Sequence, residues 1–410
     1  MQIDAINTVE RFLALRQDWE AVYAADPEAQ FFLSWTWYSR WIRDIDGDWI
    51  ILAARPGGEG TSYVGFFPLR VRVKAKQGGG VQRELVPAGN RAADYTGILC
   101  TPAAQARAIP AFARHIKTLE WLDLNLECFS ASPERTRLFL GEFPSRDFAM
   151  RGLRTVSAAD GIDNGICPYV QLPADWDCYL GTALGSNTRQ KARRFLRKAD
   201  QADQLRIAPA DSSSIERDLD ILFHFWTLKW GPKKGDNAAV ITRVLRRMVT
   251  HCFHAGCLFM PVLWRGTEPL GALAILIDQT KRSLLFYVSG CDTSTNNPPP
   301  GFLLHAYSIR HAIESGFTTY DFLRGNEPYK YAFGPQERRI SHIMLRAKRA
   351  VMARPVPNVF EAARPIWQPP TNPFAPRFDA APGTGRSLSG QGVSGQGVGR
   401  PGARFETRSS

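Results

Sequence analysis

The chain has 410 residues, and its hydrophobic fraction of 44% and charged fraction of 22% are those of a globular protein of two or three domains. No apolar run approaches the roughly 18 residues needed to span a bilayer, and the first residues lack the basic-then-apolar order of a secretory signal. The seven scattered cysteines favour a reducing compartment, so we expect a cytoplasmic protein without a membrane span.

The first half of the chain predicts an N-terminal domain over residues 1–165 that alternates helices with strands. Ser34 is a good N-cap for one of the helices. The predicted helices are 8–24, 34–45 and 102–119, and the predicted strands are 49–54, 63–73, 84–87 and 122–128.

A turn-rich stretch at 160–165 precedes a second predicted domain, residues 166–355. Its predicted elements are strand 169–172, a helix from Asp175, basic helix 186–199, strand 205–208, helices 213–230 and 238–255, strands 258–264, 270–278 and 283–289, helix 301–315, strand 317–322 and a last strand at 340–346. Mixed strands and helices in this order predict an α/β or α+β class with mixed sheets.

The last segment, 356–410, is rich in Pro, Gly and Ser and contains a tandem five-residue repeat at 389–398. Such a composition buries too little apolar surface to offset the entropy of ordering, so we expect a disordered tail. The tail carries part of the net charge of +12, a balance that favours anionic partners such as phosphates, nucleotides or nucleic acid.

The turn at 321–331 concentrates the chemistry-bearing side chains. They are Asp321, Arg324, Glu327, Tyr329 and Lys330, placed just past a predicted strand. Charged groups in that position often belong to a site in α/β folds. The alternative is a solvated, salt-bridged turn.

The basic helix has six cations and no acid among the ten residues 189–198. Its apolar residues recur with helical spacing, so one face is expected to pack and the other to carry the charge. Its arginines are Arg189, Arg193, Arg194 and Arg197. This face is either a soluble basic surface or a binding surface for nucleotide phosphates or an anionic acceptor.

The strand at 283–289 leads through a loop into a helix whose first amides belong to Gly301, Phe302 and Leu303. Free amides and the helix dipole make such an N-terminus suitable for an anion. The three prolines before Gly301 also favour simple helix initiation.

A metal site is not expected, although His251, Cys252, His254 and Cys257 cluster near a predicted helix end. Their spacing matches no familiar zinc pattern, and an ordinary helix terminus is the simpler interpretation. The chain also lacks a Walker phosphate loop, a dinucleotide fingerprint and a nucleophile elbow.

The order of basic helix, strand–Pro-Gly–helix and Asp-Phe-Leu-Arg-Gly-x-Glu-x-Tyr-Lys resembles the CelD-like branch of the GNAT acyltransferase superfamily. The first half is also similar to that branch in Phe32-Leu33-Ser34-Trp35 and in the stretch from Gly89 through Asp94-Tyr95. The resemblance covers about residues 10–350. It implies two tandem GNAT-like domains, as in Fem-type transferases, with the better-formed donor site in the second.

The resemblance implies transfer of an acetyl or other acyl group from acyl-CoA to an amine or hydroxyl of a small-molecule or saccharide acceptor, in polysaccharide or cell-envelope biosynthesis. The usual GNAT phosphate loop is absent. An aminoacyl-tRNA donor, as in Fem-type relatives, therefore stays open, and so does a non-catalytic binding protein with a decayed site. DNA is not an expected partner.

As a mechanism, we hypothesise that a backbone amide near Val288 or Ser289 stabilises the oxyanion, while Gly301, Phe302 and Leu303 hold the pyrophosphate. Asp321 or Glu327 is the expected base, with His305 a weaker choice. Tyr329 would protonate the leaving group or simply pack. Lys330 and Arg324 would neutralise donor phosphates or an anionic acceptor.

Overall fold

The computed structural model describes residues 1–45, 47–57, 60–75, 81–89, 92–158, 160–201, 205–295 and 297–348. The tail at 356–410, for which we expect disorder, lies outside the described residues. Among the described helices none has the length and hydropathy needed to cross a bilayer.

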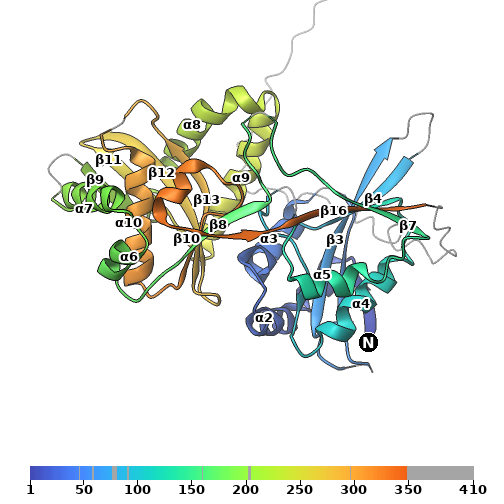
Figure 1. Ribbon diagram of the computed structural model, residues 1–410. Helices are drawn as coiled ribbons and strands as arrows, with labels where there is room; N and C mark the ends of the chain where they lie inside the picture. Colours follow the sequence, from blue (N-terminus) through green and yellow to red (C-terminus); the bar gives the residue numbers. More distant parts are fainter. Residues whose placement is uncertain are drawn as a thin grey trace, which may run out of the picture. The chain divides into compact units, whose positions relative to one another are not determined.

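The first half is built on a mixed sheet with the strand order β1-β2-β3-β4-β6-β16-β7, where β16 (Ser341–Ala347) comes from the end of the chain, and β5 pairs with β3 (Figure 1). Its strands are β1 (Gln2–Ile6), β2 (Trp49–Arg55), β3 (Gly65–Ala75), β4 (Val81–Pro87), β5 (Leu99–Cys100), β6 (Asp123–Phe129) and β7 (Phe148–Gly152). Its helices are α1 (Val9–Leu13), α2 (Arg16–Ala25), α3 (Trp35–Asp44), α4 (Gln105–Ile116) and α5 (Pro133–Leu140), with a short 3₁₀ turn η1 (Phe31–Leu33).

Strand alternation divides the core of this half between the two faces of the sheet. Ile50 and Leu52 of β2 belong to the apolar cluster that includes α4 and α5, whereas Ile51 and Ala53 belong to the cluster of α1, α2 and α3. The predicted N-cap is confirmed, because the Ser34 hydroxyl accepts the amide of the third following residue at 3.2 Å.

The second half contains another mixed sheet, ordered β15-β8-β14-β13-β12-β11-β9, with β10 paired to β12. Its strands are β8 (Ile166–Gln171), β9 (Leu205–Pro209), β10 (Leu258–Phe259), β11 (Pro261–Arg265), β12 (Glu268–Asp278), β13 (Ser283–Cys291), β14 (Thr319–Asp321) and β15 (Gln336–Arg339). Its helices are α6 (Trp176–Thr182), α7 (Ser186–Asp200), α8 (Ile215–Lys234), α9 (Asn237–His254), α10 (Pro300–Glu314) and the 3₁₀ helix η2 (Pro328–Phe333).

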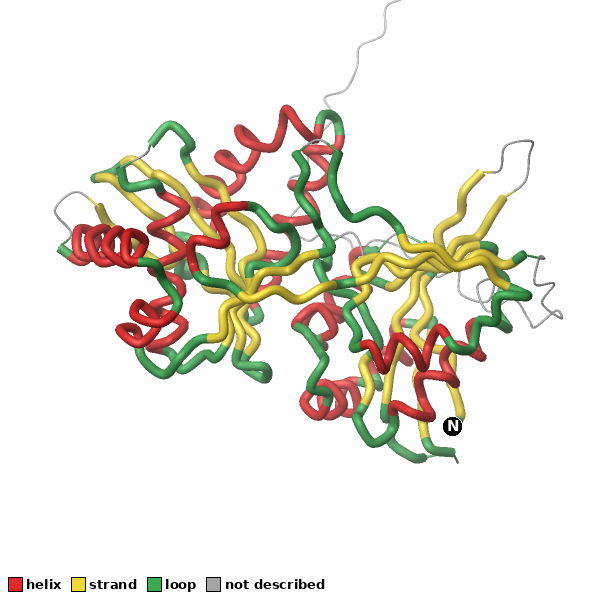
Figure 2. The backbone as a smooth tube through the Cα atoms, in the orientation of Figure 1, coloured by secondary structure: helices red, strands yellow, loops and turns green. Residues whose placement is uncertain are grey.

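Helices cover both faces of the second sheet, as the red and yellow segments of Figure 2 show. One apolar cluster joins the sheet to α6, α7 and α10, and another joins it to α8 and α9. Gly290 of β13 permits the second contact, because a Cβ there would lie 2.0 Å from the carbonyl oxygen of Leu222 in α8.

The two halves repeat one unit: a strand, a connection containing a helix, and a parallel partner strand. In the first half β4 and β6 are parallel neighbours with α4 between them in the chain. In the second, β13 and β14 are parallel neighbours with α10 between them. The expected α/β class with mixed sheets is confirmed, and the two halves share this repeated unit.

The chain returns to the first sheet at its end. Strand β16 (Ser341–Ala347) lies between β6 and β7 and pairs antiparallel with both. The sequence predicts this strand but does not predict that it pairs within the first sheet. The division into 1–165 and 166–355 stays a proposal, with β16 as the segment that does not follow it.

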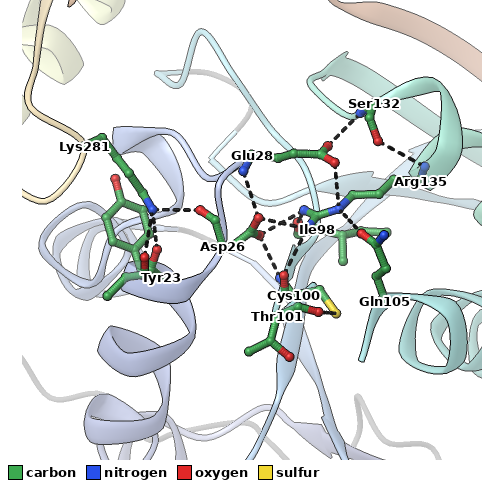
Figure 3. Close-up of polar contacts among 11 residues, drawn as sticks. Tyr23, Asp26, Glu28, Ile98, Cys100, Thr101, Gln105, Ser132, Arg135 and Lys281 are labelled. Carbon is green, nitrogen blue, oxygen red and sulfur yellow. Dashed lines mark hydrogen bonds and ion pairs between the residues drawn. The ribbon is translucent and has the colours of Figure 1, made fainter. Parts of the chain in front are cut away.

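The halves are also joined by side chains. Lys281, in the turn between β12 and β13, donates to the carbonyl oxygens of Tyr23 and Asp26, each at 2.7 Å, at the C-terminal end of α2 (Figure 3). A cation at a helix C-terminus complements the helix dipole and the free carbonyls there. Tyr23 in turn donates from its hydroxyl to the buried carboxylate of Asp278.

The sequence misses several short elements and one break. Strands β1, β7 and β15 and helix α5 are short or largely polar, so their hydrophobic periodicity is weak. The predicted helix 8–24 is two helices, interrupted at Ala14 and Leu15, and the predicted strand 317–322 is shortened to β14.

Candidate functional site

The second sheet opens where β13 and β14 separate. Their parallel pairing covers three residues and ends with Leu285 opposite Asp321. On its other edge β13 carries a bulge at Tyr287, because Phe286 and Val288 pair with adjacent residues of β12. Beyond Asp321 the chain turns away through Leu323, a non-glycine residue with φ of 57°. Bulges of this kind often lie beside active sites, where they end pairing and redirect the backbone.

In the described residues of the first half, the corresponding gap beside β6 is bridged by another segment. Its parallel pair β4–β6 also ends early, at Leu85. However, Thr96 enters beside β6 and forms a parallel bridge with Phe129. Its amide donates to the Cys128 carbonyl at 2.9 Å, and its carbonyl accepts the Ser130 amide at 2.7 Å. Among the described residues no isolated bridge of this kind occupies the gap between β13 and β14.

Asp321 lies at the start of this opening, but its carboxylate is only 1% exposed. The Tyr95 hydroxyl lies 3.0 and 3.1 Å from its two oxygens, the Leu323 amide donates to it at 2.8 Å, and Arg338 is 3.6 Å away. Burial raises the pKa of Asp321, and the Arg338 charge opposes that shift. The geometry favours an anchor that fixes the turn at Leu323 and joins the halves.

Arg324 and Lys330 are also engaged by the protein. Arg324 donates to Asp94 of the first half at 2.8 Å and forms an ion pair with it at 2.7 Å. Lys330 is 2% exposed, and its ammonium donates to the carbonyl oxygens of Arg324 and Gly325 at 2.8 and 2.9 Å. Their charges are therefore largely compensated, which weakens the expectation that they neutralise donor phosphates.

His305 of α10 is buried in an aromatic surround. Its ring lies edge-on to Phe286 at 4.5 Å between centroids, and its Nδ1 is 2.9 Å from the Tyr320 hydroxyl. Burial, with a smaller effect of the Lys330 charge, lowers the pKa of His305 to about 3. The imidazole is therefore neutral near pH 7 and a weak base.

Tyr329 and Glu327 are the candidate catalytic residues that remain accessible. Tyr329 is 43% exposed and stacks over the His305 ring at 5.8 Å. Burial of its hydroxyl, together with the charge of Glu327, raises the pKa of Tyr329, so this residue is a neutral phenol near pH 7. The Glu327 side chain is 29% exposed, and one of its oxygens lies 2.9 Å from the Lys330 ammonium.

The expected donor-binding residues gather at the end of β13 and the start of α10. Val288 is buried and Ser289 is half-buried on β13. At the first turn of α10, Phe302 stacks on Phe333 at 5.2 Å and Leu303 is fully buried. The Leu303 amide already donates to the Pro299 carbonyl at 3.2 Å, so the candidate phosphate donors of this turn reduce to the amides of Gly301 and Phe302. The N-cap of α10 is a proline without a side-chain bond to the helix, and Gly301 follows in the first turn.

The basic helix α7 packs beside α10. Phe195 contacts Phe302 edge-on at 6.3 Å, and Arg310 of α10 forms a bidentate pair with Asp200 at the end of α7. The predicted apolar face is confirmed, since Ala192, Phe195 and Leu196 are buried.

The arginines of α7 differ in their surroundings. Arg193 pairs with Asp177 at 3.2 Å, and Arg189 is half-buried against the preceding loop. Arg194 and Arg197 are exposed, and neither forms an ion pair with a described carboxylate. Among described residues, Asn187, Gln190, Lys191 and Arg194 line a hollow of about 300 Å³ on this helix.

The residues that sequence reasoning missed are those contributed by the first half and by β15: Asp94, Tyr95 and Arg338. The sequence singles out Asp94-Tyr95 only through its resemblance to a family, and no local pattern reveals the partners. His251 is 3.0 Å from the carbonyl of Thr36, and within the described ranges no group of three metal-ligand side chains occurs.

Comparison with known proteins agrees with this architecture. Residues 186–331 match the family model described as an acetyltransferase (GNAT) domain. The structure of FemX is 10% identical and has a TM-score of 0.57, with 84% of this chain and 97% of FemX covered. Residues 186–331 are therefore similar to GNAT acetyltransferase domains, and the fold of the chain as a whole is similar to that of FemX.

Two further structures are similar over most of their length. A tandem GNAT protein from the clavulanic acid biosynthesis pathway is 12% identical, with 84% of this chain and 98% of that chain covered and a TM-score of 0.40. A conserved protein of unknown function from Bacteroides thetaiotaomicron is 14% identical, with 85% and 100% covered and a TM-score of 0.47. A search of curated proteins finds no match.

Proposed function

We propose that the protein transfers an acyl group from an acyl-CoA donor to an amine or hydroxyl acceptor, in the opening between β13 and β14. The observation that carries the proposal is the separation of these strands beyond Leu285 and Asp321, next to the bulge at Tyr287 and the uncapped start of α10. An acyl carbonyl in the opening would lie along a strand edge that β14 no longer pairs. A backbone amide near Val288 or Ser289 is then the proposed oxyanion donor.

The donor phosphates are assigned to the first turn of α10 and to α7. The free amides and the dipole of α10 attract a pyrophosphate to the first turn of this helix. On α7, Arg194 and Arg197 supply exposed positive charge. A hollow open to solvent, lined by exposed side chains of α7 that include Arg194 and Lys191, lies beside these cations. This assignment replaces Arg324 and Lys330 as phosphate partners.

Proton transfers are assigned to Glu327 and Tyr329. Glu327 would accept the proton of the acceptor amine or hydroxyl as the acceptor attacks the carbonyl, and Tyr329 would protonate the departing thiolate. Both side chains are partly exposed, although Glu327 is paired with Lys330, and burial of the Tyr329 hydroxyl keeps it protonated at neutral pH. Asp321 and His305 are assigned structural roles, since Asp321 anchors the turn at Leu323 and the His305 ring stacks with Tyr329.

The test combines binding and turnover on the full chain. Titration calorimetry with acetyl-CoA should give one site per chain, since Thr96 fills the opening of the first half. Tyr329→Phe and Glu327→Gln should each lower the transfer rate about 10²-fold or more with little change in donor affinity. Tyr331→Phe, an equally exposed tyrosine two residues away, is the matched control. Full turnover in both site variants would remove their assigned roles.

An aminoacyl-tRNA donor is the second candidate, because the fold is also that of FemX and α7 is strongly basic. A tRNA would contact many phosphates, so its affinity would fall steeply with salt concentration. Binding of charged tRNA without any acyl-CoA binding would favour this candidate. A non-catalytic protein would bind neither acyl-CoA nor charged tRNA.

The acceptor is proposed to be an amino sugar or another saccharide in cytoplasmic polysaccharide or cell-envelope biosynthesis. This part rests on the sequence resemblance alone. A panel of amino sugars and simple amines, assayed for release of free CoA thiol, tests it. Equal rates for all amines would argue against a saccharide acceptor.

A further inference from the structure

The end of the α8–α9 hairpin lies at the margin of the core, where Trp230, Ile241 and Leu245 pack partly against the cluster of α8 and α9. Buried residues of α8 end at Trp226, and those of α9 begin at Met248. Residues 227–234 and 237–247 between them are helical, yet none is buried. Helices of a globular domain normally bury one apolar stripe. We call these two segments the hairpin tip.

Three lysines surround one aromatic ring in the hairpin tip. The ammonium groups of Lys229, Lys233 and Lys234 lie 5.3, 5.0 and 5.9 Å from the centroid of Trp230. None of the three forms an ion pair with a carboxylate in the described part of the chain. Three cations held around one half-buried ring repel one another, so the arrangement favours an anionic partner.

The same tip exposes aliphatic side chains. Leu228 is 63% exposed and Val240 is 52% exposed, the former on the side of α8 away from its buried stripe. Trp230 is only partly buried against the core cluster of α8 and α9. Arg243 and Arg247 of α9 add exposed positive charge. The tip therefore combines cations with apolar groups and contains no acid of its own. The nearby acids are the exposed Asp236 between its two segments and Asp160, whose pKa is lowered mainly by its hydrogen bonds and to a smaller extent by the charges of Lys233 and Lys234.

We propose that the hairpin tip docks the protein on an anionic phospholipid surface. Lysine and arginine side chains gain attraction to anionic headgroups, while tryptophan and aliphatic side chains enter the boundary between headgroups and acyl chains. A nucleic acid would satisfy the cations but would leave Leu228 and Val240 in water, so we favour lipid. The proposal does not depend on acyl transfer, and its outcome is separable from that of the donor experiments.

The test is co-sedimentation of the full chain with vesicles of phosphatidylcholine, with and without phosphatidylglycerol. Binding is expected only when the anionic lipid is present, and added salt should weaken it. Lys233→Gln with Lys234→Gln should lower binding about thirtyfold. Leu228→Ser should lower it at every salt concentration. Arg107→Gln with Arg137→Gln, two exposed cations of the first half, is the matched control and should bind as the unmodified protein does.

Several outcomes would overturn the proposal. One is the absence of binding to anionic vesicles, and another is equal loss of binding in the tip and control variants. Binding of RNA that the tip variants lose, with vesicle binding unchanged, would assign the tip to nucleic acid. All variants lie at exposed positions, and an unchanged melting temperature verifies that they are folded.

Discussion

The hydroxyl of Tyr95 lies 3.0 and 3.1 Å from the two carboxylate oxygens of Asp321, 226 residues further along the chain. Both residues are 1% exposed. This contact ties the connection that follows β4 in the first half to the end of β14 in the second. The most chemically suggestive turn of the sequence is therefore also a joint between the halves.

Tyr95→Phe removes the hydroxyl and leaves a buried carboxylate with fewer donors. We expect the free energy of unfolding to fall by about 1–3 kcal/mol, measured by urea denaturation. Tyr63→Phe is the control, since the Tyr63 hydroxyl bonds to the partly exposed Asp4 within the first half at 2.8 Å, and its loss should cost less. An equal loss of unfolding free energy in both variants would mean that the Tyr95–Asp321 contact stabilises the fold no more than the Tyr63–Asp4 contact does.

Asp321→Asn should change the pH dependence of stability. The folded-state pKa of Asp321 is raised by burial, so its stabilising contribution is complete below the unfolded pKa and is lost as pH rises through the folded one. Asparagine does not ionise, so the variant should gain stability relative to the native chain as pH rises through this window.

Asp200→Asn should show the opposite trend, because the hydrogen bond from Arg310 lowers the pKa of Asp200. That carboxylate stabilises the fold above its unfolded pKa, and the contribution is lost as pH falls through its folded pKa. Urea unfolding of both variants over a series of pH values checks the pair. The same trend in both would contradict the assigned directions.

His305→Gln should flatten the loss of stability in acid. The pKa of His305 is lowered to about 3, so its contribution is present above the unfolded value of about 6.5 and is lost as pH falls toward 3. The native chain should lose up to about 1.4 kcal/mol per pH unit in this range through this residue. The measurement is denaturant unfolding of both proteins from neutral to acid pH, and identical slopes would refute the burial argument.

Gly290→Ala should destabilise the second half, because its Cβ would meet the Leu222 carbonyl at 2.0 Å and force α8 away from β13. A loss of about 3 kcal/mol is expected. Gly231→Ala, within α8 and 3.5 Å from its nearest neighbour, should instead gain about 0.5–1 kcal/mol. Thermal unfolding compares the two, and tolerance of Gly290→Ala would show that α8 moves freely.

Arg135→Met should cost about 3–5 kcal/mol, since it leaves the fully buried carboxylate of Asp26 without its bidentate partner at 2.8 and 2.9 Å (Figure 3). Arg137→Met is the control: its pair with Glu134 is exposed, and its loss should change stability by less than about 1 kcal/mol. Urea denaturation measures both. A small effect of Arg135→Met would mean that water or another donor replaces the guanidinium.

Much of the local structure follows from the sequence. Helix α3 begins where Ser34 predicts, and α7 buries the stripe of Ala192, Phe195 and Leu196 that its periodicity predicts. These features depend on neighbours within one or two turns of helix, so the order of residues is sufficient. The same pattern, with the family resemblance, also predicts the α/β class and the repeated halves.

Tertiary structure alone decided the roles within the turn at 321–331. The sequence makes Asp321 and Lys330 candidate catalytic residues and Arg324 a candidate donor-binding residue. In the structure Tyr95, Asp94 and backbone carbonyls bond to these three side chains, whereas Tyr329 stays partly exposed. The return of β16 to the first sheet and the closure of that half by Thr96 are equally invisible in sequence. The physical reason is the same in each case. Burial and partners from distant parts of the chain decide whether a charged side chain is free to react, and the neighbouring residues in the sequence determine neither.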